Sequence, residues 1–365
     1  MKRIILLLLL SGSILSCATS RKIEQQEIKL SYLDDVVIPN DLEFDGIKVG
    51  GISGIDYHNG SYYLVCDQPS NPRFYKAEIP MINRSLDTVL ITEMIKLDNE
   101  QDFIKNNTLD LEAIRFDAET NKIILTSEGS IKYGKDPVVF EVSPEGQFLA
   151  DYKIPEYFRV SGEQKPRHNG VFEGLSESFD KKAYWVATEL PLEKDGPKPK
   201  VFPTKSMVRI TKFNKKTKEA ERQFAYKLDG ISKLPINWFA VNGVTDILEY
   251  AEDKFLILER AYSAGYGSNG NTVKIFQVDA SKASNTLAID NLKKSDYQKA
   301  SKKLVFDFKS IKSFLTKEII DNIEGMTFGP DLPNGKKSLI LVSDDNFSSF
   351  SKQINQFILL ELEIK

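Results

Sequence analysis

The chain has 365 residues, of which 41% are hydrophobic and 28% are charged, and its formal net charge is −3. It therefore has no basic field of the kind that dominates binding to DNA or RNA, which excludes nucleic acid as an expected partner. With only two histidines and two cysteines, the chain also cannot build a zinc site from several histidines or a network of disulfides.

The N-terminus has the layout of an export signal. Lys2 and Arg3 precede the apolar run 4–10, which is too short to span a membrane, and small residues follow it. Residues 14–17, Ile-Leu-Ser-Cys, resemble a bacterial lipobox, in which the cysteine becomes the lipidated first residue. We expect a signal peptide over 1–17 with lipidation at Cys17, a tether over 18–28 and a place in the bacterial cell envelope. An ordinary signal peptide with a chance cysteine is the alternative.

The remainder, residues 29–365, contains a five-fold repeat. Each repeat begins with an apolar strand that carries a polar or acidic residue, and continues with a second apolar strand that runs into an acid. The first strands contain Ile52-Ser53-Gly54, Leu111-Glu112-Ala113, Phe172-Glu173-Gly174, Thr245-Asp246-Ile247 and Ile323-Glu324-Gly325; the second strands span 63–67, 123–128, 184–189, 255–259 and 339–344. Such a repeat indicates one domain in which sheet units pack on their neighbours.

Further strand-like runs complete each repeat. A third run follows every pair and most repeats add a fourth, so the pattern predicts four-stranded antiparallel units, the blades of an all-β propeller. Residues 30–38 form an orphan strand, and the last unit ends after three strands. Pairing the two would close the ring and remove exposed sheet edges. We count five blades, with a degraded sixth within 190–244 or 260–322 as the alternative.

Three segments fall outside the blade pattern. The Pro- and Lys-rich stretch 192–206 and the Gly-, Ser- and Asn-rich stretch 261–272 each follow a second-strand acid and are expected to form lids. Residues 310–320 are expected to form a short helix with one apolar face, capped by Ser310.

The acids of the repeat are expected to meet. The first strand of each blade lines the central channel of a propeller, so equivalent residues gather around its axis. Carboxylates at such close range repel one another and are costly to desolvate, so they need raised pKa values or bound cations. Calcium takes six to eight oxygen ligands and suits this chemistry. The predicted ligands are Glu112, Glu173, Asp246, Glu324 and Asp344; the alternative is that each acid caps a strand or joins an ion pair.

Other charged residues have predicted roles beside these ligands. The second-strand acids Glu128, Glu189 and Glu259 are candidates for a general acid or base. Arg115 and Arg260 are predicted to bind an anionic substrate group, although either could form a structural ion pair instead.

Three motifs resemble the phytase-like family, which is described by an esterase-like activity of phytase. They are Phe172-Glu173-Gly174-Leu175-Ser176, Glu259-Arg260-Ala261-Tyr262-Ser263, and Asn322-Ile323-Glu324-Gly325-Met326 with 341–347 after it. The resemblance spans roughly residues 45–363. It implies a secreted or envelope propeller, related to calcium-dependent phytases, that acts on phosphate esters or other esters.

We therefore expect an envelope-anchored, calcium-dependent hydrolase of phosphate monoesters or related esters, with a metal-activated water in the central channel. Its partners would be a small anionic or ester substrate and the membrane, the latter through the lipid anchor only, and a closed propeller is expected to be a monomer. The alternative is a non-catalytic propeller lipoprotein that binds a ligand or partner and uses calcium only for its structure.

Overall fold

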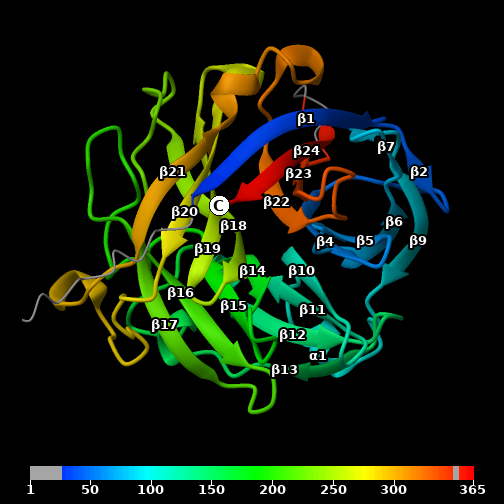
Figure 1. Cartoon of the computed structure of the whole chain (residues 1–365). Helices are drawn as coiled ribbons and strands as arrows, with labels where there is room; N and C mark the ends of the chain where they lie inside the picture. The colour runs from blue at the N-terminus through cyan, green and yellow to red at the C-terminus, as the bar shows by residue number, and fades with distance from the viewer. Residues whose placement is uncertain (1–26, 348–352) are drawn as a thin grey trace, which may run out of the picture.

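Five four-stranded antiparallel sheets surround a central axis in the computed structural model of this chain (Figure 1), which describes residues 27–347 and 353–365. The all-β propeller with five blades is therefore confirmed. The two stretches considered for a sixth blade, 190–244 and 260–322, contribute strands only to the third and fourth blades. The predicted signal peptide, Cys17 and residues 18–26 of the tether lie outside the described residues.

The blades follow one another along the chain, each starting with its innermost strand. Blade 1 is β4 (Ile52–His58), β5 (Ser61–Cys66), β6 (Arg73–Glu78) and β9 (Leu90–Lys96); blade 2 is β10 (Leu111–Asp117), β11 (Lys122–Ser127), β12 (Val138–Val142) and β13 (Phe148–Asp151); blade 3 is β14 (Phe172–Glu177), β15 (Ala183–Thr188), β16 (Met207–Asn214) and β17 (Ala220–Lys227).

Blade 4 is β18 (Ala240–Ala251), β19 (Lys254–Ser263), β20 (Asn271–Asp279) and β21 (Ser301–Asp307), and blade 5 is β22 (Ile323–Phe328), β23 (Lys337–Ser343), β24 (Asn355–Ile364) and β1 (Ile28–Ile38). Smaller elements are the hairpins β2 (Glu43–Phe44) with β3 (Ile47–Lys48) and β7 (Met81–Ile82) with β8 (Ser85–Leu86), and the helix α1 (Asp102–Asn106). Among the described residues, no helix has the length and apolar character needed to cross a membrane.

The first strand of the domain closes the ring. β1 pairs antiparallel with β24, from Ile28 opposite Ile364 to Ile38 opposite Asn355, and so supplies the outermost strand of blade 5. Figure 1 shows this as the blue strand β1 running beside the red strand β24. The predicted closure is thus present, and it covers the edge that β24 would otherwise expose.

The core lies between neighbouring blades, because each sheet buries apolar side chains on both faces. Ile340 and Phe357 of blade 5, for example, pack in one cluster with Ile55 and Leu64 of blade 1. Each such buried side chain contributes about 1.5–3 kcal/mol relative to an exposed one. This packing fixes the blades around the axis and therefore fixes the loops at the mouth of the channel.

The helix predicted over 310–320 is wrong. The segment contains two 3-10 turns, Phe308–Ile311 and Thr316–Glu318, and Lys317 has a φ of +60°, which no α-helix accommodates. Leu315 is buried as the pattern predicts, but Phe314 is 68% exposed. The apolar spacing therefore reflects separate contacts of two turns with the core.

Candidate functional site

Each innermost strand carries a β-bulge at the same place. In β4 the pairing with β5 shifts by one residue between Ile52 and Gly54, and matching shifts occur in the other four innermost strands. A bulge leaves one residue unpaired and redirects its side chain. The residues at this position are Ser53, Glu112, Glu173, Thr245 and Glu324.

Blade 3 shows what the bulge does. Phe172 of β14 pairs with Thr188 of β15, and the bulge begins after Phe172. Glu173 follows Phe172 in the chain, and Glu189 follows Thr188. Both carboxylates line one pocket around the axis, and both are at most 8% exposed. Equivalent positions in blades 1, 2 and 5 supply further acids, so the predicted convergence occurs in those blades.

Blade 4 departs from the predicted alignment by one residue. Its last pair before the bulge is Val244 with Glu259, so the residues that follow are Thr245 and Arg260. Because a shift of one residue along a strand moves a side chain to the other face, the positions predicted for Asp246 and Glu259 are wrong. Arg260, also a predicted site residue, takes the position that Glu189 has in blade 3.

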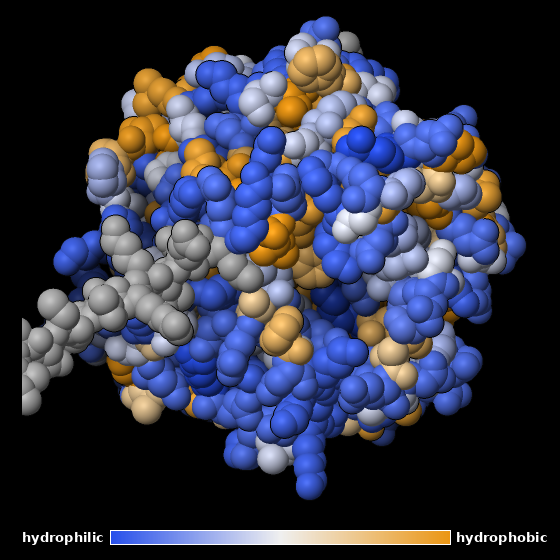
Figure 2. Space-filling view, viewed as in Figure 1, coloured by the Kyte–Doolittle hydropathy of each residue, from blue (hydrophilic) through white to orange (hydrophobic). Residues whose placement is uncertain are grey.

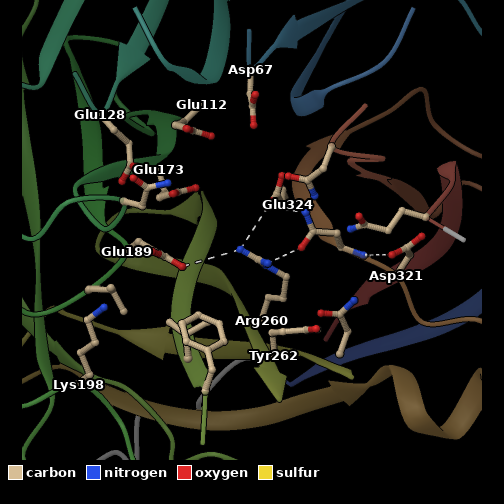
Figure 3. Close-up of a pocket in the computed structure, with 18 of the residues that line it drawn as sticks. Asp67, Glu112, Glu128, Glu173, Glu189, Lys198, Arg260, Tyr262, Asp321 and Glu324 are labelled. Atoms are coloured by element: carbon tan, nitrogen blue, oxygen red, sulfur yellow. Dashed lines mark hydrogen bonds and ion pairs between the residues drawn. The ribbon is translucent and has the colours of Figure 1, made fainter. Parts of the chain in front are cut away.

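The pocket encloses about 1040 Å³ at the mouth of the channel. Among the described residues that line it, seven are acidic and two are basic, with His168 and several amides beside them. The acids are Asp67, Glu112, Glu128, Glu173, Glu189, Asp321 and Glu324, and the basic residues are Lys198 and Arg260. Figure 3 shows the carboxylates projecting toward one another from several blades.

The carboxyl groups are held in an environment that opposes their ionisation. Burial raises the pKa of Glu112 well above its ordinary value, and the neighbouring carboxylates, Glu173 first among them, raise it further. The pKa of Glu173 is raised in the same way, chiefly by burial and then by Glu128 and Glu189. The ring thus has an excess of negative charge that its two basic side chains do not balance.

Arg260 lies at the centre of this charge distribution. Its Nη2 atom is 3.2 Å from Oε1 of Glu324 and 3.8 Å from Oε1 of Glu189, and its Nη1 donates to Oδ1 of Asn322. The Nε–H has no partner among the described residues. Arg260 therefore keeps a free donor beside the carboxylates (Figure 3).

Two overlapping groups of three acids have the spacing of a cation site. Asp110, Glu112 and Glu128 form one group and Glu128, Glu173 and Glu189 form the other, with the oxygens of each group within 4.8 Å of one another. Calcium binds oxygens at about 2.3–2.6 Å, so two ligands on opposite sides of one ion are about 4.8 Å apart. The donors are hard oxygens, which suits calcium or magnesium.

Asp344 adds an unsatisfied oxygen near the same ring. It is fully buried, its Oδ1 accepts from the backbone N–H of Asn346 at 2.7 Å, and its Oδ2 has no hydrogen-bond partner among the described residues. Burial, followed by the charges of Glu324 and Asp67, raises the pKa of Asp344 well above its usual range. A buried carboxyl oxygen without a hydrogen-bond partner could serve as a cation ligand.

The predicted pair of Asp246 as ligand and Arg115 as anion binder lies elsewhere. Nη2 of Arg115 is 3.2 Å from both carboxylate oxygens of Asp246, and both side chains are buried outside the pocket. Asp246 also accepts from the backbone N–H groups of Leu175, Ile247 and Met326. This ion pair therefore joins the innermost strands of blades 2, 3, 4 and 5.

Glu259, a predicted general acid or base, is likewise held by protein groups. It accepts from Tyr226, Asn242 and Lys302 at 2.6, 2.8 and 2.6 Å. It is 2% exposed and does not line the pocket. Its contacts connect blade 4 with blade 3 and leave it no access to a substrate.

Asp110 beside the pocket, and His168 and Asp321 in its lining, are titratable residues that were not assigned from the sequence. Asp110 lies two residues before Glu112 and thus on the same side of an extended chain, a spacing that could have identified it. His168 and Asp321 come from loops that precede β14 and β22, where no periodic signal exists. Of the two expected lids, 192–206 contributes Lys198, and 261–272 is mostly the extended hairpin of β19 and β20.

Comparison with known families and structures adds one specific result. Residues 47–347 match the family model described as "Phytase-like: Esterase-like activity of phytase". No curated protein gives a significant match.

Among solved structures, the chain resembles a thermostable family-43 glycoside hydrolase (12% identity, 87% of this chain and 93% of that chain, TM-score 0.48). It also resembles glutaminyl cyclase from Myxococcus xanthus (7% identity, 93% and 98%, TM-score 0.43) and a duf4221 member from Bacteroides vulgatus (10% identity, 94% and 100%, TM-score 0.41). These likenesses are too remote to bear on function.

Proposed function

Because this chain belongs to the phytase-like family, we propose that it is a calcium-dependent hydrolase of phosphate monoesters or related esters that acts in the pocket at the channel mouth. The observation that carries the proposal is the excess of buried carboxylates. Seven acids and two bases line the pocket among the described residues, and ionised carboxylates in such excess are costly unless protons or cations neutralise them.

The residues that would hold calcium follow from the spacing of their oxygens. Asp110, Glu112 and Glu128 form one group whose oxygens lie within 4.8 Å of one another, and Glu128, Glu173 and Glu189 form the other. Glu324 and Asp344 extend the carboxylates toward blade 5, where the free Oδ2 of Asp344 is available. When bound, calcium would supply the positive charge that admits an anionic ester and makes a water molecule more acidic.

The chain itself supplies groups for binding the substrate and for moving protons. The guanidinium of Arg260 lines the pocket and supplies positive charge for an anionic oxygen of the ester, and Lys198 adds positive charge to the same pocket. In hydrolysis, a water oxygen bonds to phosphorus, the ester P–O bond breaks, and the leaving alcohol oxygen takes a proton. Glu189, beside Arg260, is the candidate to accept the proton that water loses.

Lipid anchoring at Cys17 remains part of the proposal, and the path of the chain gives it an orientation. Ile28 pairs with Ile364 at one end of blade 5, while Glu324 and Asp344 lie at the other end. A tether over residues 18–27 could reach about 33 Å from the end of blade 5 at which Ile28 lies. We expect the pocket of the anchored protein to open away from the membrane.

The test is to compare the wild type with Glu173→Gln in the presence of calcium and of a chelator. Removing one buried negative charge should raise the melting temperature of the metal-free protein by a few degrees and lower calcium affinity at least about tenfold. Calorimetric titration and thermal unfolding measure the two effects. Loss of stability without any change in calcium binding would contradict the metal site.

Hydrolysis separates the enzyme from a non-catalytic calcium-binding propeller. We expect 4-nitrophenyl phosphate or 4-nitrophenyl acetate to be hydrolysed with calcium, and the rate to fall more than about 100-fold in Glu189→Gln. Glu259→Gln is the matched control, because that carboxylate lies outside the pocket. Calcium binding with no turnover of either ester would favour the non-catalytic alternative.

A further inference from the structure

One wall of the pocket is aromatic rather than acidic. Phe239, Tyr262 and Tyr266 line it together with Val241, and the rings of Phe239 and Tyr262 lie 6.2 Å apart. Figure 3 shows Tyr262 on the opposite side of Arg260 from Asp67 and Glu112. The pocket is thus divided into a carboxylate part and an aromatic part.

The loop before β18 builds this wall and exposes an unusual amount of apolar surface. Leu234, Ile236, Trp238 and Phe239 are 70%, 62%, 96% and 56% exposed. The hydrophobic effect alone would bury such side chains, so their exposure marks a binding surface when they lie together beside a pocket.

Hydrogen bonds hold this loop in place against the tip of the β19–β20 hairpin. The N–H of Ile236 donates to the carbonyl of Ala264 at 2.9 Å, and the N–H of Ala264 donates to the carbonyl of Phe239 at 2.9 Å. Tyr266 donates to the carbonyl of Leu234 at 2.8 Å. A side chain at Gly265, whose φ is +98°, would come within 2.5 Å of Ile236, so glycine allows this contact.

The backbone at Trp238 is strained. Its φ is +59°, a conformation that bulky residues rarely adopt. Strain of this kind persists only where the surroundings hold it, and it recurs at ligand sites. Here the strained residue directly precedes Phe239, which lines the pocket.

The aromatic wall lies in line with Arg260. Arg260 and Tyr262 are two residues apart on β19, so both side chains project to the same side of the strand, about 7 Å apart along it. An ester whose anionic group meets Arg260 would therefore place its other part against Tyr262 and Phe239.

We propose that the pocket selects esters of alcohols that carry an aromatic ring, with the anionic group at Arg260 and the aromatic ring against Phe239, Tyr262 and Tyr266. This inference rests on the proposed function, because it assigns the alcohol part of the same substrate. Aromatic rings stack on one another at centroid distances of 4.5–7 Å, a contact that a flexible polar alcohol cannot make. The exposed Leu234 and Ile236 extend the apolar surface beyond the ring.

The experiment compares kcat/KM for three phosphate monoesters with calcium present: 1-naphthylmethyl phosphate, hexyl phosphate and glycerol 2-phosphate, all of which release an alkyl alcohol, so that leaving-group acidity does not favour the ring. We expect the naphthyl ester to be preferred over both others, and Phe239→Leu to lower its kcat/KM about 3- to 10-fold more than that of hexyl phosphate. Phe179→Ala is the matched control, since Phe179 is a similarly exposed phenylalanine in the turn between β14 and β15, away from the pocket.

Two results would overturn the proposal: hexyl phosphate accepted as well as the naphthyl ester, or the same substrate ratios in Phe239→Leu and Tyr262→Leu as in the wild type. Titration of the calcium-loaded protein with 1-naphthylphosphonate, which is not hydrolysed, measures binding to the ring site even if the protein hydrolyses no ester. If no ester is hydrolysed but this probe binds, and binds more weakly to Phe239→Leu, the hydrolase fails while the ring site stands. An absence of binding at all would reject the ring site.

Discussion

At the scale of single residues, a carboxylate acts differently at two neighbouring positions of the innermost strands. Asp246 carries a carboxylate like Glu173, yet it accepts three backbone N–H groups and pairs with Arg115 at 3.2 Å. All its oxygens are therefore occupied by the protein. The pocket acids Glu112 and Glu173 instead face other carboxylates, which raise their pKa values.

Replacing Asp246 by Asn should separate a structural role from a ligand role. The variant leaves the buried Arg115 charge unpaired, which costs about 3–5 kcal/mol of unfolding free energy. We expect calcium affinity to stay within about twofold, because Asp246 does not line the pocket. Urea unfolding and calcium titration measure the two quantities, and a large loss of calcium affinity in a folded variant would return Asp246 to the metal site.

The raised pKa values predict how pH affects the metal-free protein. Burial and neighbouring charges raise the pKa to about 8 for Asp67 and Glu128 and to about 7 for Glu189, whereas unfolded carboxyls titrate near about 4. The folded state therefore binds more protons between these values, so the stability contributed by these groups is complete below about pH 4 and is lost as pH rises toward 8.

Thermal unfolding in chelator between pH 5 and pH 8 tests this dependence. We expect the melting temperature to fall by several degrees across the range, to fall less in Glu128→Gln, and to rise at pH 8 when calcium is added. A metal-free protein that is more stable at pH 8 than at pH 5 would show that the carboxylates are not crowded in solution.

At the scale of elements, the bulges of the innermost strands decide which side chains enter the pocket. The residue after the bulge is small in most blades because the innermost strands approach one another closely there. A Cβ atom at Gly325 would lie 2.9 Å from Cα of Gly54, and one at Gly54 would lie 2.7 Å from the carbonyl oxygen of Glu112. The repeat thus has an acid where the bulge directs a side chain into the pocket. It has a small residue at the next position because the neighbouring innermost strand leaves no room for a larger one.

Gly325→Ala should therefore disturb both stability and the site. Overpacking against a backbone atom costs about 1–3 kcal/mol, and any shift of β22 moves Glu324, its neighbour in sequence. We expect weaker calcium binding together with the loss of stability, measured by calorimetry and urea unfolding. An unchanged unfolding free energy would mean that the innermost strands of the protein in solution are less tightly packed around Gly325 than in the structure.

At the scale of the whole molecule, ring closure joins the two ends of the domain. β1 contributes the outer strand of blade 5 through pairs that run from Ile28 to Ile38. The closed ring holds each blade between two neighbours, and the pocket draws residues from every blade. The site consequently depends on pairing between segments more than 300 residues apart.

Removing β1 should open the ring. A protein that begins at Pro39 would expose the edge of β24, and we expect it to aggregate or to unfold at least about 10 °C lower than a protein that begins at Glu27. Size-exclusion chromatography and thermal unfolding provide the comparison. Equal stability of the two proteins would show that β1 is dispensable for closure.

Polar and apolar side chains are distributed unevenly over the surface of the molecule. The face seen in Figure 2 is mostly hydrophilic, and its hydrophobic side chains occur in separate patches.

Three motifs in the sequence indicated the family. The recurring apolar strands were enough to predict the propeller blades, with five counted and a sixth left open, and the closing strand. These depend on short-range periodicity, because a strand that buries both faces between neighbouring blades must read as apolar wherever it occurs. The convergence of Glu112, Glu173 and Glu324 also followed from the sequence, since equivalent positions of a ring must meet at its axis.

Tertiary structure alone decided which residue of blade 4 occupies the ring. Nothing local distinguishes Asp246 from Thr245 or Glu259 from Arg260, because the one-residue shift depends on the pairing of β18 with β19. The aromatic wall likewise needed the fold, since the loop ending at Phe239 meets the tip of the β19–β20 hairpin only through long-range packing. Periodicity determines which face of a strand is buried, whereas register and loop contacts determine which chemistry reaches the pocket.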